Sequence, residues 1–458
     1  MSDHIFSTKQ KTAFSLAFLP GWLIQVVFVV WVFTFYFSAV GLSVYYITLA
    51  YIIWAVWNAI NDPLLGYISD RTRTRWGRRK PYIMVGIVPI LIIMVIVWTV
   101  PFQESEFIFL YLLLILFAFD LFFTMIAVPL DCLFPELYSS EEDRAQVNIY
   151  RQIFSVVGII AGFLIPSIFI GEISIREGYL ISGIIITIIA GISFLISLKW
   201  GITEREEFKL DSHHEFGFFQ GLKYTFKNRA FVLYTIMLVA FEYIQLLQAT
   251  IMPQFSKFVL NEESTLASGI LLGLNQIVAI ASMIVWSKIG IKLGSKKGYF
   301  IAACILFISF IPLLFISDLT AAIIAIFICG IGFGGLLFFT TLLIADIIDE
   351  DELKTGFRRE GSFFGPTNFF MRITGILSIL TISLVFSSTG WEEYTPNPGV
   401  DVIFGLRLLM AVFPMIAAGI LGVCIILYPL SKNRVLEIKK EMTELHQKKR
   451  DRVAKTQI

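Results

Sequence analysis

NAINDPLLGYISDRTRTRWGRRKP, residues Asn58–Pro81, is the stretch of sequence that decides the fold. It begins inside an apolar run that opens near Tyr45, and it ends in six cations before another apolar run starts at Tyr82. Polar side chains within such a run are costly in a bilayer, so they usually face a cavity or a partner. The stretch therefore predicts a membrane-spanning helix with a polar face, followed by a charged turn into the next span. This arrangement is typical of a transporter.

The composition agrees with a membrane protein. Hydrophobic residues make up 57% of the chain and charged residues only 16%, whereas soluble proteins carry about 25% charged residues. A membrane span needs about 20 predominantly apolar residues. Twelve such runs lie roughly at 13–37, 44–68, 81–100, 107–134, 152–170, 179–198, 231–258, 267–291, 299–316, 319–344, 361–386 and 404–430. We expect an all-α polytopic membrane protein with twelve transmembrane helices.

The longest polar interruption, from about Lys199 to Ala230, separates six runs from six. The charged turns after spans two and four have weaker counterparts after spans eight and ten, which indicates two diverged repeats. A repeat of this kind places a binding site between the halves, near the bilayer midplane. The predicted parts are an N-terminal six-helix bundle (1–198), a cytoplasmic linker (199–230), a C-terminal six-helix bundle (231–430) and a cytoplasmic tail (431–458).

Charge asymmetry predicts the topology. If the N-terminus is cytoplasmic, the inside segments hold nearly all basic residues and the outside loops are acidic, with Arg176 as their one central cation. This pattern follows the positive-inside rule. We expect a multi-pass protein of the plasma membrane, with both termini cytoplasmic. Its partners would be a small-molecule solute and the lipid bilayer, with no nucleic acid, and it would be a monomer. The tail is predicted to be a charged helix at the membrane surface, with Val435, Ile438, Met442 and Leu445 on one side.

Several motifs resemble those of a known family. Gly66-x-x-x-Asp70-Arg71, followed by Gly77-Arg78-Arg79, resembles the loop motif of the major facilitator superfamily. A sharper resemblance is to its glycoside–pentoside–hexuronide:cation symporters, the family of the melibiose permease. It is carried by NDP at 61–63, RTRWG at 73–77, Ile126–Pro135 in span four and ADIID at 345–349. The resemblance implies the major facilitator fold, with two six-helix bundles. It also implies secondary active symport of a glycoside or related sugar, coupled to H⁺ or Na⁺, by alternating access.

The chain departs from the family at individual positions. The sodium-using relatives place two aspartates one helical turn apart on span two, where this chain has Asn58 and Asp62. The sugar-binding carboxylates of the melibiose permease align with Trp22 and Ala127, and its span-eleven lysine aligns with Arg372. The resemblance therefore implies a shared framework with a changed substrate chemistry.

The candidate cation-coupling residues are Asp62, Asn58 and Asp120, and Asp62 is expected to be the coupling carboxylate. Asn58 and Asp62 share a helix face, because they stand at i and i+4. A carboxylate with amide oxygens suits Na⁺, and a carboxylate alone suits a proton. One fewer acid than in the sodium users favours H⁺, although Na⁺ at Asp62 and Asn58 stays open because Asp120 could supply the missing charge. A structural hydrogen bond between helices is the other interpretation of this pair. We expect no cofactor and no other metal.

The candidate substrate-binding residues are Trp22, Glu242, Asn368 and Arg372. Trp22 offers a stacking face for a sugar ring, and Glu242 lies inside span seven. Arg372 stands one turn after Asn368 and is either a substrate clamp or half of a structural ion pair. As a clamp it would suit an acidic sugar such as a hexuronide. Melibiose itself is not expected.

The candidate gating residues lie near the cytoplasmic ends of the spans. Charge pairs there must break as the two halves rock. Arg151 matches a family arginine at the start of span five, so the resemblance implies that it pairs with the acidic turn after span four. Asp131 is either a gate or a surface acid. The full set is Asp70, Arg71, Arg78, Asp131 and Arg151.

Other functions fit the sequence less well. The same fold could carry a non-sugar solute such as a lysolipid, or the chain could be a non-transporting receptor or scaffold. No nucleophile–base constellation or ATP-binding loop is present, so we expect no enzyme. The glycine-rich GIGFGG at 330–335 mimics a dinucleotide loop, but it lies inside an apolar span. There it predicts close packing of helices.

Overall fold

The computed structural model describes residues 6–72, 74, 76–138, 140–203, 228–355 and 361–456. These residues form long helices, and no β-strand occurs in the described ranges. A single isolated bridge joins Thr74 to Gly77 in the turn after the second long helix. The all-α fold predicted from the apolar runs is confirmed.

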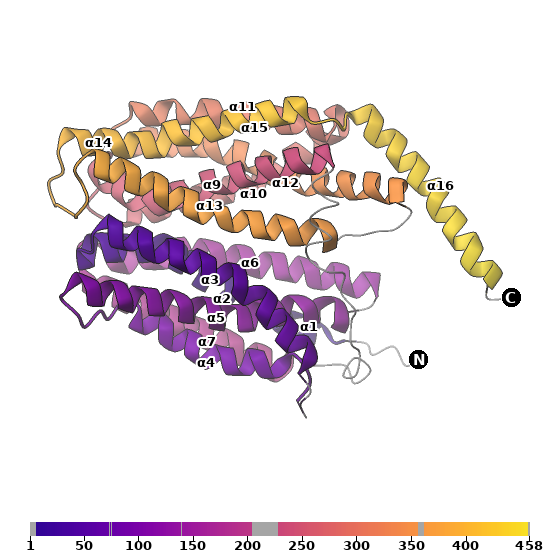
Figure 1. Ribbon diagram of the computed structural model, residues 1–458, viewed down its shortest axis with the longest axis horizontal. Coiled ribbons are helices and arrows are strands. Elements are labelled where there is room, and N and C mark those ends of the chain that lie inside the picture. The colour runs from indigo at the N-terminus through magenta and orange to yellow at the C-terminus, as the bar shows by residue number, and fades with distance from the viewer. Residues whose placement is uncertain are drawn as a thin grey trace. The chain divides into compact units, whose positions relative to one another are not determined.

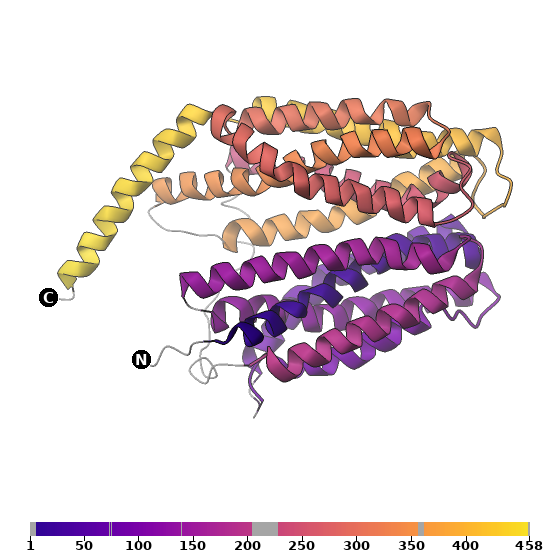
Figure 2. The same cartoon turned by 180° about the vertical axis from the view of Figure 1, so that it is seen from behind.

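The chain divides into two compact units. The first comprises the described parts of Met1–His214, Ala249–Gly273 and Ile379–Leu406. Within it α2 packs on α6, α3 and α4 on α5, and α7 on α4 and α6 (Figures 1 and 2). Its N-terminal helices are α1 (Thr8–Leu16), α2 (Phe18–Thr34), η1 (Phe35–Val40), α3 (Val44–Arg71), α4 (Lys80–Ile96), α5 (Ser105–Leu137), α6 (Glu141–Ile170) and α7 (Arg176–Trp200).

The second unit comprises the described parts of Glu215–Gln248, Leu274–Ser378 and Arg407–Ile458. In it α11 packs on α12 and α15, and α16 packs on α12. The helices from here to the C-terminus are α9 (Arg229–Phe258), α10 (Leu266–Leu293), α11 (Ser295–Phe310), η3 (Pro312–Leu314), α12 (Leu319–Thr355), α13 (Gly361–Ser388), α14 (Val400–Arg407), η4 (Leu408–Val412), α15 (Phe413–Leu427) and α16 (Lys432–Thr456).

This division does not follow the 199–230 linker throughout. Parts of α9, α10 and α13, and α14 up to Leu406, belong to the first unit although they come from the second half of the sequence. Hydrogen bonds join them to N-terminal helices, from Gln254 Nε2 to Thr34 Oγ1 at 3.2 Å and, directly before α10, from Thr265 Oγ1 to Ser167 O at 2.9 Å. The two six-span bundles remain a prediction at the level of their boundaries.

Most of the predicted spans correspond to helices long enough to cross a bilayer. Eleven helical segments in the described ranges have the necessary length and apolar composition. The third predicted run corresponds to α4, an apolar helix of 17 residues, which is followed by a short turn at Val97–Thr99. The polytopic membrane architecture is confirmed, and α4 is the short member of the set.

The glycine-rich segment of α12 allows close helix packing, as the sequence predicted. A Cβ atom built on Gly334 would lie 2.1 Å from the carbonyl oxygen of Ala279 on α10. One built on Gly330 would lie 2.8 Å from Val278 Cβ on the same helix. Only glycine lets the two backbones approach this closely.

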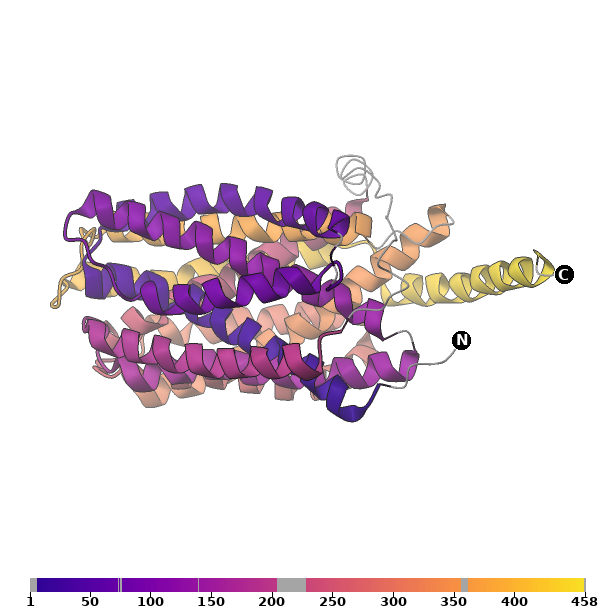
Figure 3. The same ribbon diagram turned by 90° about the horizontal axis from the view of Figure 1, so that it is seen from below.

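The tail forms a helix, α16, that packs partly on its own unit. Ile438 and Met442 are buried, and Lys439 Nζ lies 3.9 Å from Asp346 Oδ1 on α12. Figure 3 shows α16 extending past the ends of the other helices of its unit. Part of the predicted apolar side is therefore covered by protein. The position of α16 at a membrane surface remains a prediction.

Replacing Gly334 by alanine tests the close packing of α12 on α10. The added methyl group meets backbone rather than a flexible side chain, so we expect a loss of about 1–3 kcal/mol of stability. Gly419→Ala on α15 is the control, because its Cβ would meet no atom within 4 Å. Thermal unfolding of the purified protein should show a lower Tm for Gly334→Ala alone. Equal Tm values for both variants would contradict the packing.

Candidate functional site

A carboxylate is buried between α3 and α5 in the first unit. Asp120, on α5, is 4% exposed. Asn58 Nδ2 donates a hydrogen bond to its Oδ1, and Asn61 Nδ2 donates one to its Oδ2 at 2.9 Å. Hydrogen bonds to an ionised acceptor are stronger than neutral ones. The two amides can therefore hold Asp120 in its charged form inside an apolar bundle.

The amides lie on a polar face of α3 that follows the helical repeat. Trp54, Trp57, Asn58 and Asn61 are spaced by three or four residues, so their side chains leave the helix on one side. The Trp57 ring stacks on Phe117 of α5, with centroids 5.2 Å apart and planes at 19°. We call Asp120, Asn58 and Asn61 the Asp120 cluster. The ring contact fixes one side of it.

Three polar atoms on this face have no hydrogen-bond partner within the described part of the chain. They are the indole nitrogens of Trp54 and Trp57 and the amide oxygen of Asn61, and all three are buried. An unsatisfied buried polar group costs about 1–3 kcal/mol. The Asn61 oxygen is chemically the most informative of them. It is a hydrogen-bond acceptor on the same amide group whose nitrogen donates to Asp120.

The structure brings together two of the three predicted coupling residues, Asn58 and Asp120. The side chain of Asp62 lies outside the described residues. Sequence reasoning did not select Asn61, although its position three residues after Asn58 puts it on the same helix face. Its contact with Asp120 needed the register of α3 against α5, which spacing along one helix does not give.

A cavity of about 410 Å³ lies in the same unit. Trp22 forms part of its wall and is 41% exposed. The wall also includes Ala127, so both positions aligned with sugar-binding carboxylates of the family border this space. Polar groups are contributed by Gln25 of α2, Asp131 of α5, and Arg151, Gln152 and Ser155 of α6. An apolar wall with a few fixed polar groups is typical of small-molecule sites.

Arg151 is fixed at the edge of this cavity. Its Nη2 lies 2.8 Å from Asp131 Oδ1, and its guanidinium lies over the rings of Phe18 and Phe134, 4.0 and 4.4 Å from their centroids. Arg151 was expected to pair with the acidic turn before α6. It pairs with Asp131 of α5 instead, because it lies further along α6, opposite that helix. A gating role for the two residues remains a prediction.

Helix α5 connects the buried carboxylate to the cavity. Phe119, next to Asp120, stacks on Phe28 of α2 with centroids 3.5 Å apart, and on Phe123 at 5.5 Å. Phe123 then lines the cavity. A movement of α5 that changes the bonding of Asp120 would therefore also move a wall of the cavity.

The arginines of the α3–α4 turn form charge pairs at the end of α5, as predicted for this motif. Arg78 Nη2 and Arg79 Nη2 each lie 2.8 Å from Glu136 Oε1, and both arginines are buried. The acidic turn is also paired, since Lys11 Nζ lies 2.5 Å from Asp143 Oδ1. The side chains of Asp70 and Arg71, also predicted to gate, lie outside the described residues.

The remaining predicted substrate residues belong to the second unit. Glu242 lies on α9 and Arg372 on α13, and both side chains are partly buried. The side chain of Asn368 lies outside the described residues. Convergence of these groups with Trp22 on one substrate remains a prediction.

An ionic contact in the first unit joins segments from both halves of the sequence. Lys257 Nζ, near the end of α9, lies 2.7 Å from Glu172 Oε1 in the α6–α7 loop and 3.2 Å from the Tyr394 hydroxyl. The hydrogen bond from Lys257 lowers the pKa of Glu172 below its usual value. We call these three residues the latch.

Backbone bonds and aromatic rings surround the latch. Thr265 N donates to Gly171 O at 2.7 Å, and Val44 N donates to Glu392 O at 2.9 Å. The ring of Phe37 meets that of Trp391 edge-on, with centroids 5.0 Å apart. The helices of the first unit are therefore tied together at this end. The sequence offered no signal for this, because loop contacts do not follow a helical repeat.

The family match covers most of the chain. The model of the MFS/sugar transport protein family matches residues 13–432. The chain belongs to this family, within the major facilitator superfamily. The family predicted from NDP, RTRWG and ADIID is thereby confirmed, together with a transporter fold rather than an enzyme.

Several named relatives are similar over more than four fifths of their length. A putative sulfoquinovose importer of Salmonella typhimurium is 24% identical, over 96% of this chain and 93% of that protein. The isoprimeverose transporter of Lactiplantibacillus pentosus is 22% identical, over 87% of this chain and 84% of that protein. The sodium-dependent lysophosphatidylcholine symporter 1 of Xenopus tropicalis is 23% identical, over 86% of this chain and 82% of that protein.

Solved structures support the fold. A bacterial homolog of the human lysosomal transporter Spinster, crystallised in an inward-facing and unoccupied conformation, superimposes with a TM-score of 0.67. The match covers 92% of this chain and 98% of that one at 16% sequence identity. At this identity the likeness shows the fold alone.

Replacing Glu172 by glutamine tests the latch. Because its pKa is lowered, the charged contact persists at neutral pH and weakens only as the pH falls through that lowered value. We expect the latch to keep this end of the first unit closed. An exposed ion pair contributes at most about 1 kcal/mol, so its loss should speed the opening of this end by about two- to fivefold. The measurement is labelling of Ser38→Cys, a buried position near this end, in a background without other cysteines.

Glu177→Gln, at an exposed acid on the first turn of α7, is the matched control. It should leave the labelling rate unchanged. As the pH falls through the lowered pKa of Glu172, the ratio of the labelling rates of Glu172→Gln and the parent should approach one, because protonation removes the charge from the parent as well. Equal rates in the parent and Glu172→Gln at neutral pH would show that the latch does not hold this end closed.

Proposed function

We propose that this protein is a secondary active transporter that couples the movement of a glycoside or related sugar to that of a cation by alternating access. The observation that carries the proposal is Asp120, a buried carboxylate bonded to Asn58 and Asn61 on the helix that also lines the cavity. A charge inside an apolar membrane helix is costly, so it usually marks a functional site. The sugar and the cation are supported by the names of several relatives, among them a putative glycoside/cation symporter of Escherichia coli.

A proton is the coupling ion that this geometry favours. In the ionised state both carboxylate oxygens of Asp120 accept N–H groups. Protonation gives one oxygen a hydrogen that must find an acceptor, and the Asn61 amide oxygen has no partner in the described residues. Rotation of the Asn61 amide would turn that oxygen toward Asp120, so one amide flip serves both protonation states.

Sodium would need a different arrangement. Na⁺ is bound by oxygen ligands, whereas the amide nitrogens of Asn58 and Asn61 face Asp120. Both amides would have to rotate, and Asp62 would have to supply a further oxygen. We therefore place the coupling proton on Asp120 and assign Asp62 a neighbouring role, where the sequence alone favoured Asp62.

The sugar is proposed to bind in the cavity beside Trp22. Its indole offers a flat apolar face, and Gln25 and Gln152 offer donors and acceptors for hydroxyl groups. Ala127 removes an acceptor that the melibiose permease supplies, which argues against a galactoside bound in the same way. The second oxygen of Asp131, whose side chain is 64% exposed, can supply a substitute acceptor.

Asp120→Asn tests the coupling. In proteoliposomes with an imposed proton gradient, the variant should exchange labelled sugar across the membrane but fail to accumulate it. Removing the titratable group ends the link to the gradient, whereas the cavity is left intact. Asp401→Asn, at an exposed acid on α14, is the control and should accumulate sugar normally.

Three outcomes would contradict this proposal. Accumulation by Asp120→Asn, with loss in Asp62→Asn, would move the coupling group to Asp62. Accumulation driven by a sodium gradient at constant pH would replace the proton by Na⁺. Absence of any gradient-driven uptake over a broad solute panel would contradict transport itself.

A binding panel tests the substrate class. Neutral glycosides, hexuronides and sulfoquinovose should be compared with lysophosphatidylcholine on the parent protein and on Trp22→Ala. Loss of the stacking face should weaken sugar binding by about tenfold, whereas Trp200→Ala should have no effect. Selective loss of acidic sugars in Arg372→Gln would identify Arg372 as a clamp. Binding of the lysolipid, with no binding of any sugar, would contradict a glycoside as the substrate.

A further inference from the structure

A second cavity, of about 380 Å³, lies in the second unit between α16 and the adjoining ends of α10, α11 and α12. It is separate in sequence and structure from the Asp120 cluster and the Trp22 cavity. Three lysines line it: Lys296 at the start of α11, and Lys432 and Lys439 on α16. Neither the transport cycle nor the family match assigns this cavity a role.

Two of the lysines are held in place by helix-end carbonyls. Lys296 Nζ donates to Tyr428 O at 2.6 Å and to Ile426 O at 3.0 Å. Lys432 Nζ donates to Lys292 O at 2.8 Å and to Ile291 O at 3.3 Å. An ammonium group has three donors, so each of these lysines keeps one N–H. Neutral carbonyls leave their positive charge uncompensated.

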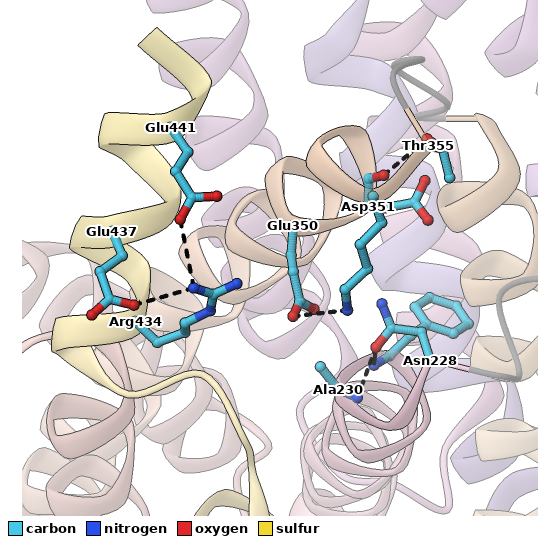
Figure 4. Close-up of polar contacts among 10 residues, drawn as sticks. Asn228, Ala230, Glu350, Asp351, Thr355, Arg434, Glu437 and Glu441 are labelled. Atoms are coloured by element: carbon cyan, nitrogen blue, oxygen red, sulfur yellow. Dashed lines mark hydrogen bonds and ion pairs between the residues drawn. The ribbon is translucent and has the colours of Figure 1, made fainter. Parts of the chain in front are cut away.

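The third lysine is weakly compensated. Lys439 Nζ lies 3.9 Å from Asp346 Oδ1, which is beyond hydrogen-bond distance. The nearby arginine does not add to this charge, because Arg434 is paired with Glu437 at 3.1 Å and with Glu441 at 3.7 Å along α16 itself (Figure 4). The described lining of the cavity therefore holds three lysines and no carboxylate, and Asp346 approaches Lys439 without lining the cavity.

A glycine positions Lys432 at the edge of the cavity. Gly294 has φ +83°, a conformation that side chains rarely adopt, and a Cβ there would lie 2.8 Å from Lys432 Cβ. Only a glycine at this turn allows the lysine stem to lie across it. The ammonium group of Lys432 is thereby directed to the end of α10.

The other part of the lining is apolar and exposed. Ile291 is 78% exposed and Leu436 is 56% exposed, and Phe338 and Leu342 complete this side. Exposed apolar residues continue along α10 at Ile284 and Val285. A ligand complementary to this lining is an amphiphile with an anionic head and a long apolar chain.

We propose that this cavity binds the headgroup of an anionic phospholipid. The phosphate lies among the three lysine ammonium groups, and an acyl chain runs along the exposed apolar face of α10. Basic pockets between transmembrane helices on the cytoplasmic side are known to take such headgroups. The bound lipid joins α16 to α10 and α11, and so stabilises the docked position of the tail.

The test uses the full-length protein in nanodiscs of phosphatidylcholine with added phosphatidylglycerol, followed by detection of retained lipid by native mass spectrometry. The parent should retain phosphatidylglycerol selectively. Lys439→Gln should reduce retention by about fivefold, since one basic residue contributes about 1 kcal/mol. Lys440→Gln, at an exposed neighbour outside the cavity lining, is the control for net charge and should retain lipid as the parent does.

Asp346→Asn separates lipid binding from a purely structural contact. It removes the competing carboxylate, so the lipid proposal expects stronger retention. If Asp346→Asn and Lys439→Gln reduced retention equally, the effect would come from their mutual contact and the proposal would be overturned. Equal retention in Lys439→Gln and Lys440→Gln would also overturn it. Displacement of the lipid by millimolar glycerol phosphate would identify a soluble phosphate site instead.

Discussion

The pair of hydrogen bonds from Asn58 and Asn61 to Asp120 is the interaction on which the rest of the account depends. An ionised carboxylate cannot remain inside an apolar helical bundle without partners, and these amides supply one donor to each oxygen. The contact also fixes the register of α3 against α5. Helix α5 continues into the wall of the Trp22 cavity. A change of charge at Asp120 that shifts α5 would therefore also shift the wall against which a solute would bind.

The latch imposes a second constraint on the same unit. Lys257, Glu172 and Tyr394 join segments from both halves of the sequence at one end of the first unit. The charge is partly exposed, so the contact is weak enough to break during a transport cycle. The first unit therefore combines a strongly held buried carboxylate with a weakly held contact between segments from both halves of the sequence.

Much of the fold follows from the sequence because bilayer constraints are simple. Long apolar runs must become helices, and the glycines of α12 indicate close packing before any contact is known. The site was only partly predictable for a physical reason. Spacing identifies residues on one helix face, such as Asn58 and Asn61, but the choice of Asp120 as their partner depends on the register between two helices.

The pairing of Arg151 illustrates the same limit. The match to a family arginine suggested a contact with the acidic turn that precedes α6, whereas the side chain reaches Asp131 on the neighbouring α5. The latch was not visible in the sequence at all, since its members are separated by 85 and 137 residues along the chain. Local sequence patterns cannot specify such contacts between distant loops.

The most direct test of the central claim is infrared difference spectroscopy of the reconstituted protein, recorded as sugar is added at constant pH. The account predicts a change in the carbonyl band of a protonated carboxylic acid. This change should be absent in Asp120→Asn and present in Asp62→Asn. A band that persists in Asp120→Asn would show that the proton is carried elsewhere, and the coupling role given to the Asn58–Asp120–Asn61 cluster would be contradicted.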